Sequence, residues 1–96
     1  MRLTPTEQQV IRDASLQRFG VRPRLFGSRV DDTKHGGDID LYIETQLSPE
    51  DAFSREMHLS ADLYLALGDR KIDIVVNAGW LDLPIYQVAR AQGVWL

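Results

Sequence analysis

The chain has 96 residues, of which 44% are hydrophobic and 26% are charged, and its formal net charge is −3. This length and composition predict one small globular domain over residues 1–96 rather than a disordered or multidomain chain. The acidic balance argues against stable nucleic-acid binding, because proteins that hold DNA or RNA through its phosphates are normally basic. The absence of cysteine excludes disulfides, thiolate metal sites and a cysteine nucleophile.

The sequence also gives an expectation about location. Residues 1–10 lack the apolar core of a signal peptide, and no stretch approaches the length of a membrane span. The lack of cysteine fits a reducing compartment. We therefore expect a soluble, cytoplasmic protein that does not associate with a membrane.

The first predicted element is a helix that begins after Thr4. Thr4, Pro5 and Glu7 have the residue types and the spacing of an N-cap, a first helical proline and a capping box. Gly20 is a natural end for this helix.

Residues 21–26 predict a short strand after that helix. Pro23 indicates either the beginning of the strand or an edge position in the sheet. Gly27 ends the strand. Residues 28–37 contain polar residues and glycines that predict a turn, and they leave room for a short helix beginning near Ser28.

Residues 38–44 alternate between polar and apolar side chains, which predicts a half-buried strand. The polar face of this strand carries Asp38, Asp40 and Tyr42. The spacing puts the two carboxylates on the same face, roughly 6.5–7 Å apart along the strand.

A long helix is predicted between Ser48, which can cap it, and Gly68, which ends it. Pro49 suits the first helical position. The broad apolar face that we expect to be its core face consists of Phe53, Met57, Ala61, Tyr64 and Leu65, with Leu63 and Leu67 beside them.

The rest of the chain predicts a strand over residues 70–76, a helix over 83–92 and a short terminal strand near 93–96. Asp73 interrupts the apolar run of the strand. This order of elements predicts an α/β or α+β domain with one small sheet. From these patterns alone, the sequence leaves open whether the strands run parallel or mixed.

Asp38, Asp40 and Asp73 are the candidate metal-ligating and catalytic residues. If the strand that carries Asp73 pairs beside residues 38–44, three carboxylates meet on one patch, and such hard oxygen ligands suit Mg²⁺ or Mn²⁺. Two such ions about 4 Å apart can activate an attacking oxygen and stabilise a leaving one in phosphoryl or nucleotidyl transfer. The alternative is a solvated strand face, with Asp73 as an exposed charge on an edge strand.

Gly27 and Ser28 are candidate phosphate-binding residues. A glycine directly after a strand lets the backbone approach a ligand closely, and the N–H groups that follow can hold a phosphate. Alone, this pair is an ordinary turn. Together with the three carboxylates, it supplies the groups that a metal–nucleotide complex needs.

Residues 25–44, followed by residues 71–76, resemble the minimal nucleotidyltransferase domain of the DNA polymerase β-like superfamily, of the antitoxin type. The signature is Gly-Ser, a short spacer, Asp-x-Asp and a later strand aspartate, and the resemblance covers most of the chain. It implies a small mixed β-sheet flanked by helices. The sequence departs from the commonest pattern, because nine residues separate Ser28 from Asp38 and Gly37 stands where serine is frequent.

The resemblance implies a role for each acidic residue. Asp38 and Asp40 would bind two Mg²⁺ ions, for which Mn²⁺ could substitute. Asp73 would join the metal ion that bears the attacking hydroxyl and would help that hydroxyl to lose its proton.

The resemblance also implies that Gly27 and Ser28 hold the β- and γ-phosphates of ATP. Arg29 would assist them; the alternative is a solvated residue after a turn. Many minimal members are antitoxins encoded beside a HEPN-domain toxin, and some transfer AMP from ATP to a tyrosine of that toxin. A HEPN-type toxin is therefore the expected protein partner.

Three functions stay open at this point. The first is an Mg²⁺-dependent nucleotidyltransferase that acts on a protein hydroxyl within a toxin–antitoxin pair. The second is a weakly catalytic or non-catalytic antitoxin that masks its partner, and the third is a nucleotidyltransferase that acts on a small molecule. The sequence allows an oligomer but does not specify one.

Overall fold

The computed structural model describes residues 3–27 and 38–96, which form a small mixed α+β fold. The predicted fold class is therefore confirmed. Each predicted helix and strand is found in the described ranges, and the short helix considered near Ser28 lies outside them. The elements are α1 (Pro5–Phe19), β1 (Arg24–Phe26), β2 (Ile39–Glu44), α2 (Pro49–Leu67), β3 (Ile72–Asn77), α3 (Pro84–Gln92) and β4 (Val94–Trp95).

The four strands form one mixed sheet in the order β3-β2-β1-β4. β2 and β3 run parallel and are joined by α2, whereas β1 is antiparallel to both β2 and β4. Pro23 immediately precedes β1, and β1 has a neighbour on each side, so the edge interpretation of Pro23 is wrong. None of the helices in residues 3–27 and 38–96 is long and apolar enough to cross a membrane.

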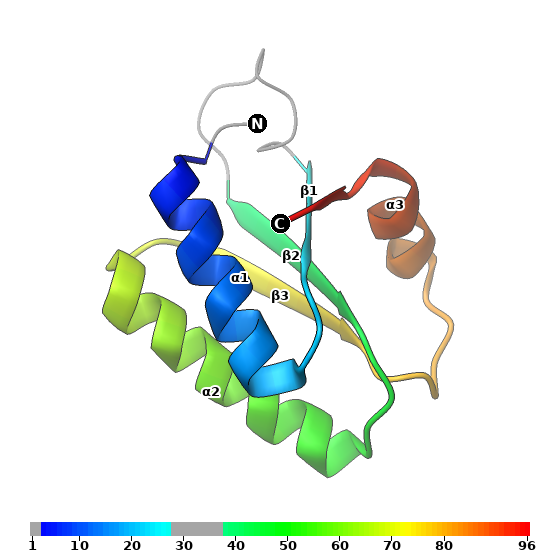
Figure 1. Ribbon diagram of the computed structural model, residues 1–96. Coiled ribbons are helices and arrows are strands. Elements are labelled where there is room, and N and C mark those ends of the chain that lie inside the picture. The colour runs from blue at the N-terminus through cyan, green and yellow to red at the C-terminus, as the bar shows by residue number, and fades with distance from the viewer. Residues whose placement is uncertain (1–2, 28–37) are drawn as a thin grey trace.

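Helices cover both faces of the sheet (Figure 1). α1 and α2 pack on one face, and alternate residues of β1 and β2 point into that core. α3 packs on the opposite face, where Tyr86 and Ala89 contact Phe26 and Tyr42. The main core consists of Leu3, Ile11, Phe19, Leu25, Ile39, Leu41, Ile43, Leu59, Leu63 and Leu96.

The capping signals predicted the first helix correctly. The Thr4 N–H donates to Glu7 Oε1 at 2.8 Å, and the Glu7 N–H donates to Thr4 Oγ1 at 3.1 Å, so the capping box is formed. Gly20 ends α1 in the left-handed conformation, with φ at 73°.

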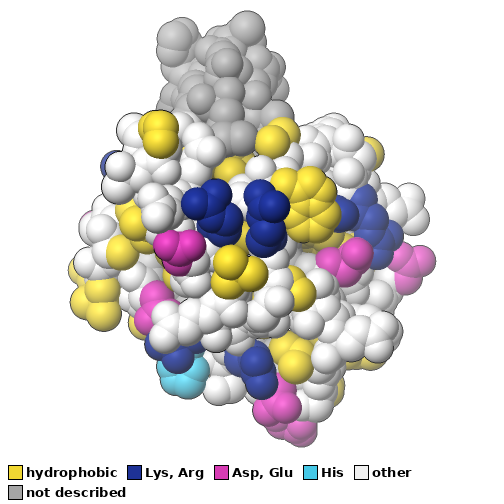
Figure 2. Space-filling model, viewed as in Figure 1, with side chains coloured by type: hydrophobic (Ala, Val, Ile, Leu, Met, Phe, Trp, Pro, Cys, Tyr) yellow, Lys and Arg dark blue, Asp and Glu magenta, His cyan; other side chains and the backbone are white. Residues whose placement is uncertain are grey.

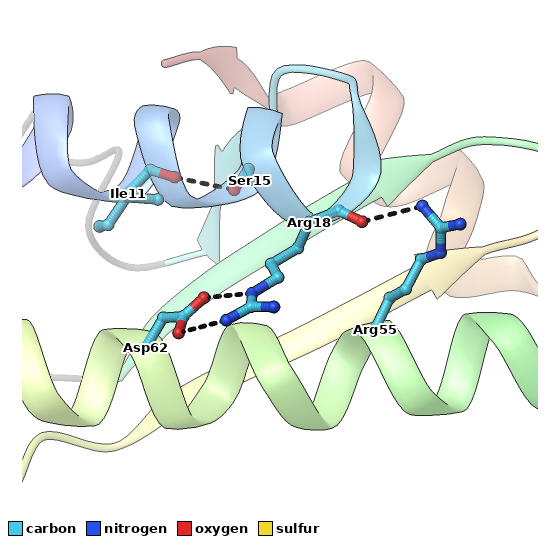
Figure 3. A network of polar contacts seen from close by, with 5 residues as sticks. All are labelled: Ile11, Ser15, Arg18, Arg55 and Asp62. Atoms are coloured by element: carbon cyan, nitrogen blue, oxygen red, sulfur yellow. Dashed lines mark hydrogen bonds and ion pairs between the residues drawn. The ribbon is translucent and has the colours of Figure 1, made fainter.

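Polar contacts hold the C-terminal half of α1 against α2 (Figure 3). Arg18 donates from Nε to Asp62 Oδ2 at 2.6 Å and from Nη2 to Oδ1 at 3.0 Å, which is a two-point ion pair. Arg55 Nη1 donates to the main-chain oxygen of Arg18 at 3.1 Å. Within α1, the buried Ser15 hydroxyl donates to the oxygen of Ile11 at 2.8 Å. These contacts fix α2 beside α1 and so position the crossover from β2 to β3.

The predicted core face of α2 is wrong in most of its members. The residues of α2 that lie buried are Ala52, Leu59 and Leu63. Five of the expected core residues are instead exposed, namely Ala61, Phe53 (66%), Met57 (56%), Tyr64 (60%) and Leu65 (83%). The prediction failed because α2 carries apolar side chains on two sides. The side with fewer apolar residues packs into the core, and the side with more of them is exposed.

One face of β2 is buried, and on the opposite face Asp40 has intermediate burial and Glu44 is exposed, so the half-buried strand is confirmed except at Tyr42. Tyr42, which was assigned to the polar face, is 1% exposed. Its ring lies under α3, with its centroid 5.9 Å from that of Tyr86. The polar character of this face is therefore confined to the two ends of the strand.

Candidate functional site

The parallel pairing of β2 with β3 places Asp40 directly beside Asp73. Register partners in neighbouring strands direct their side chains to the same face of the sheet. The two carboxylates thus lie side by side on the face that α3 covers farther along the strands. The sequence supplied both residues, but their adjacency depends on the parallel direction of the strands, which it left open.

Asp38 lies just before β2 and is held by a lysine. Lys71 Nζ is 3.3 Å from Asp38 Oδ2, and the N–H of Ile39 donates to the oxygen of Lys71 at 3.1 Å. The hydrogen bond and the charge of Asp38, followed by the charge of Asp73, raise the pKa of Lys71. Sequence analysis did not single out Lys71, although its position two residues before Asp73 was a signal, because it places both side chains on one face.

The electrostatics of this end of the sheet are unfavourable for Asp40. Partial burial is the largest cause that raises the pKa of Asp40, and the charges of Asp73 and Asp38 raise it further. The Lys71 charge opposes these effects but does not cancel them. A carboxyl whose ionised form is disfavoured by its own fold is a frequent feature of functional sites.

Gly27, at the end of β1, lies in close contact with the Asp40 carboxylate. Its φ is 78°, in the left-handed region, and a Cβ at this position would collide with Asp40 Oδ2. Glycine is therefore needed both for the backbone conformation and for the close approach. Ser28 and Arg29, the other predicted phosphate-binding residues, lie outside the described residues.

The three aspartates suit a hard cation in their chemistry but are not gathered around one point. In the two described ranges, no three His, Cys, Asp or Glu side chains lie close enough together to hold a metal ion. Asp40 and Asp73 provide adjacent oxygen donors of the type that Mg²⁺ prefers. Asp38 would become a third donor on exchanging its contact with Lys71 for one with the ion.

A separate hollow of about 540 Å³ lies at the other end of β2. Arg24 is one of its lining residues, and its guanidinium lies 4.1 Å from the ring centroid of Trp95 and 5.7 Å from that of Tyr42. Figure 2 shows basic side chains beside a hydrophobic ring near the middle of this view of the molecule. The hollow includes none of the candidate aspartates, so it is not the acidic site. Its lining residues are Leu16, Gly20, Val21, Arg22, Arg24, Tyr42, Glu44 and Trp95.

Comparison with known proteins adds no family to this geometry. A scan against protein-family models and a search of the curated proteins each found no match. The residues of the acidic site and the resemblance in their spacing are therefore the features that point to a function.

Proposed function

We propose that this chain is an Mg²⁺-dependent nucleotidyltransferase that moves a nucleoside monophosphate, AMP from ATP, onto a hydroxyl of a partner protein. One observation carries the proposal: Asp40 and Asp73, distant in sequence, are register partners at the end of the sheet where Gly27 closes on Asp40. The raised pKa of Asp40 supports a functional role, because its ionised form weakens the fold and such carboxyls are frequent at functional sites.

The reaction assigns a task to each residue. The acceptor oxygen attacks the α-phosphorus of ATP, a new P–O bond forms, and the bond to the β-phosphate oxygen breaks as pyrophosphate leaves. Asp73 would accept the hydroxyl proton or direct it to water, and Asp38 and Asp40 would hold the metal-bound triphosphate. Bound Mg²⁺ would supply charge stabilisation for the phosphates. Gly27 would let the triphosphate approach the backbone.

The proposed acceptor is a hydroxyl of a HEPN-type toxin, with this chain as the cytoplasmic antitoxin of the pair. The resemblance of the Gly-Ser, Asp-x-Asp and Asp73 positions to minimal nucleotidyltransferases supports this assignment. The small size of the described fold also supports it, because a single sheet with three helices leaves little surface for a separate acceptor-binding lobe.

The test is transfer of label from α-labelled ATP to the protein encoded beside this chain, with Mg²⁺ present. We expect label on the partner, and we expect Asp40→Asn and Asp73→Asn each to lower the rate about 10³-fold, which corresponds to several kcal/mol of transition-state stabilisation. Glu44→Gln is the matched control, since it removes one carboxylate charge at the other end of β2 and should retain transfer. Absence of transfer by the native chain, or equal transfer by Asp40→Asn, would contradict the proposal.

A second candidate function is neutralisation of the partner by masking, without catalysis. The contact between Asp38 and Lys71 favours it, because a cation of the protein already occupies one of the three carboxylates. Neutralisation that persists in the Asp38→Asn/Asp40→Asn double variant would support masking. Neutralisation that is lost while the complex still forms would support catalysis.

A further inference from the structure

α2 exposes an apolar surface on the side opposite its buried residues, and Leu65 at the edge of this surface also lines a hollow beside α1. Phe53, Met57, Ala61, Tyr64 and Leu65, here called the α2 stripe, recur at helical spacing and are all exposed. Ser54 and Ser60 lie beside the stripe, and Glu56 and His58 lie on its two flanks. α2 packs against α1 and β3 (Figure 1), and the side chains of the stripe stay exposed beside these contacts.

β3 is an edge strand, with β2 on one side and no strand among the described residues on the other. The N–H groups of Ile39 and Thr45 in and after β2 donate hydrogen bonds to the carbonyl oxygens of Lys71 and Asn77. Because successive carbonyls of a strand alternate in direction, the residues between them direct their backbone groups outward. The residues with outward N–H and C=O groups are Ile72, Ile74 and Val76. Such an edge is a template for pairing with another strand.

We propose that this edge and the α2 stripe together bind a second copy of the chain, in a two-fold dimer with one continuous sheet. The two β3 strands would pair antiparallel around Ile74, and the two α2 helices would lie antiparallel beside each other above them. Ile74 would then exchange both of its outward hydrogen bonds with Ile74 of the second copy, as an antiparallel hydrogen-bonded pair does.

The shape of the α2 stripe favours a second copy over an unrelated partner. In the antiparallel arrangement, the crossing point falls at Ser60 and Ala61, whose small side chains allow the helices to approach closely. Met57 of one copy then packs against Tyr64 of the other, and the two-fold axis repeats the contact. An isologous interface requires this kind of self-complementary surface.

The α2 stripe alone is smaller than a stable interface, and it reaches that size only together with the β3 edge. At roughly 200 Å² for each large side chain, the exposed fractions of Phe53, Met57, Tyr64 and Leu65 amount to on the order of 500 Å² per copy. A standard interface buries about 800 Å² per partner. Pairing of the β3 edges supplies the remainder. This inference does not depend on the proposed function, because neither surface contains the acidic residues of the site apart from Asp73, whose side chain points to the face of the sheet.

The test measures the mass of the full-length chain in solution over a range of concentrations. We expect a dimer for the native chain, and we expect Met57→Arg and Tyr64→Arg each to raise the dissociation constant at least tenfold. Val88→Arg on α3 is the matched control, because Val88 is also an exposed apolar helix residue (41%), and it should leave the dimer unchanged. A monomeric native chain, or a dimer that Val88→Arg disrupts while Met57→Arg does not, overturns the proposal.

Hydrogen exchange tests the sheet pairing without any variant. The Ile72, Ile74 and Val76 amides should become protected as the concentration of the native chain rises, because the dimer gives them acceptors that the described residues of one copy do not provide. Met57→Arg should abolish this concentration dependence. A dimer in which the Ile74 amide exchanges as fast as in dilute solution contradicts the continuous sheet.

Discussion

The pKa of a carboxylate shifts in opposite directions at the two ends of β2. Asp40 and Glu44 lie on the same face of the strand, yet the pKa of Asp40 is raised and that of Glu44 is lowered. Burial and the neighbouring acids Asp73 and Asp38 act on Asp40. A hydrogen bond from the Tyr42 hydroxyl is the main cause at Glu44, followed by one from Arg90. One end therefore gathers like charges, and the other pairs a charge with donors.

The Glu44 end has the character of a structural network. The Tyr42 hydroxyl donates to Glu44 Oε1 at 2.6 Å and accepts a hydrogen bond from the buried Asn77 Nδ2 at 3.0 Å. Arg90 Nε donates to the same Glu44 oxygen at 2.6 Å. Because these polar groups satisfy one another, they stabilise the fold. At the Asp40 end Lys71 compensates the gathered charges only in part, and departures of this kind from local stability are expected at functional sites.

The largest stability effect in this comparison should come from Gly27→Ala. We expect a loss of about 2 kcal/mol in the free energy of unfolding, since a left-handed alanine costs about 1–2 kcal/mol and the new Cβ also displaces the Asp40 carboxylate. Gly20→Ala is the control in urea unfolding, because Gly20 has a similar φ of 73° and nothing within 4 Å of the added Cβ. Equal losses for the two variants would mean that the contact with Asp40 is unimportant.

Tyr42→Phe tests whether the hydrogen-bond network at the Glu44 end stabilises the fold. It deprives the buried Asn77 amide of its acceptor and Glu44 of a donor, so we expect a loss of about 1–2 kcal/mol. Tyr86→Phe should lose less, because the Tyr86 hydroxyl reaches only the oxygen of Val76, at 3.5 Å. Chemical denaturation of both variants provides the measurement, and a larger loss for Tyr86→Phe would show that the network is not the stabilising element.

Asp40→Asn should stabilise the protein at neutral pH while abolishing the proposed transfer. A like-charge pair across neighbouring strands is unfavourable by about 0.2–1 kcal/mol, and the amide removes it. Since the folded pKa of Asp40 lies above the unfolded value of 3.8, its ionisation weakens the fold as the pH rises through the folded pKa. The gain in Tm should therefore disappear below pH 3.8. A lower Tm than that of the native chain at pH 7 would remove the electrostatic argument for the site.

Glu44→Gln should have the smallest effect and the opposite sign. The folded pKa of Glu44 lies below its unfolded value of 4.5, so its ionised form contributes stability above that pH, and the contribution is lost as the pH falls through the folded pKa. The variant should thus be less stable than the native chain at pH 7 and equal to it in strong acid. Parallel Tm curves for Asp40→Asn and Glu44→Gln would show that the two ends do not differ.

Much of the fold followed from local signals in the sequence. The capping box at Thr4 and the proline and serine at the start of α2 predicted the two long helices, because these residues satisfy backbone groups in a way that needs no tertiary context. The core face of α2 and the burial of Tyr42 were mispredicted. Both depend on which neighbour covers an apolar side chain, and periodicity does not specify the neighbour.

The acidic site was only partly predictable for a related reason. Its residue types and spacing drew attention to Asp40 and Asp73, but their adjacency depends on the direction and register of β3 relative to β2. Lys71 was missed because its only sequence signal, the two-residue spacing from Asp73, becomes informative once the pairing of β3 with β2 is known. The positions of Ser28 and Arg29 stay predictions.

The crossover through α2 has a consequence for the order of folding. Because α2 lies between Asp40 and Asp73 in the sequence, their contact is non-local, and we expect their repulsion to be absent from early, local structure. Relief of that repulsion should consequently act mainly on the lifetime of the native state rather than on the speed with which the chain reaches it. A bound cation would prolong that lifetime in the same manner.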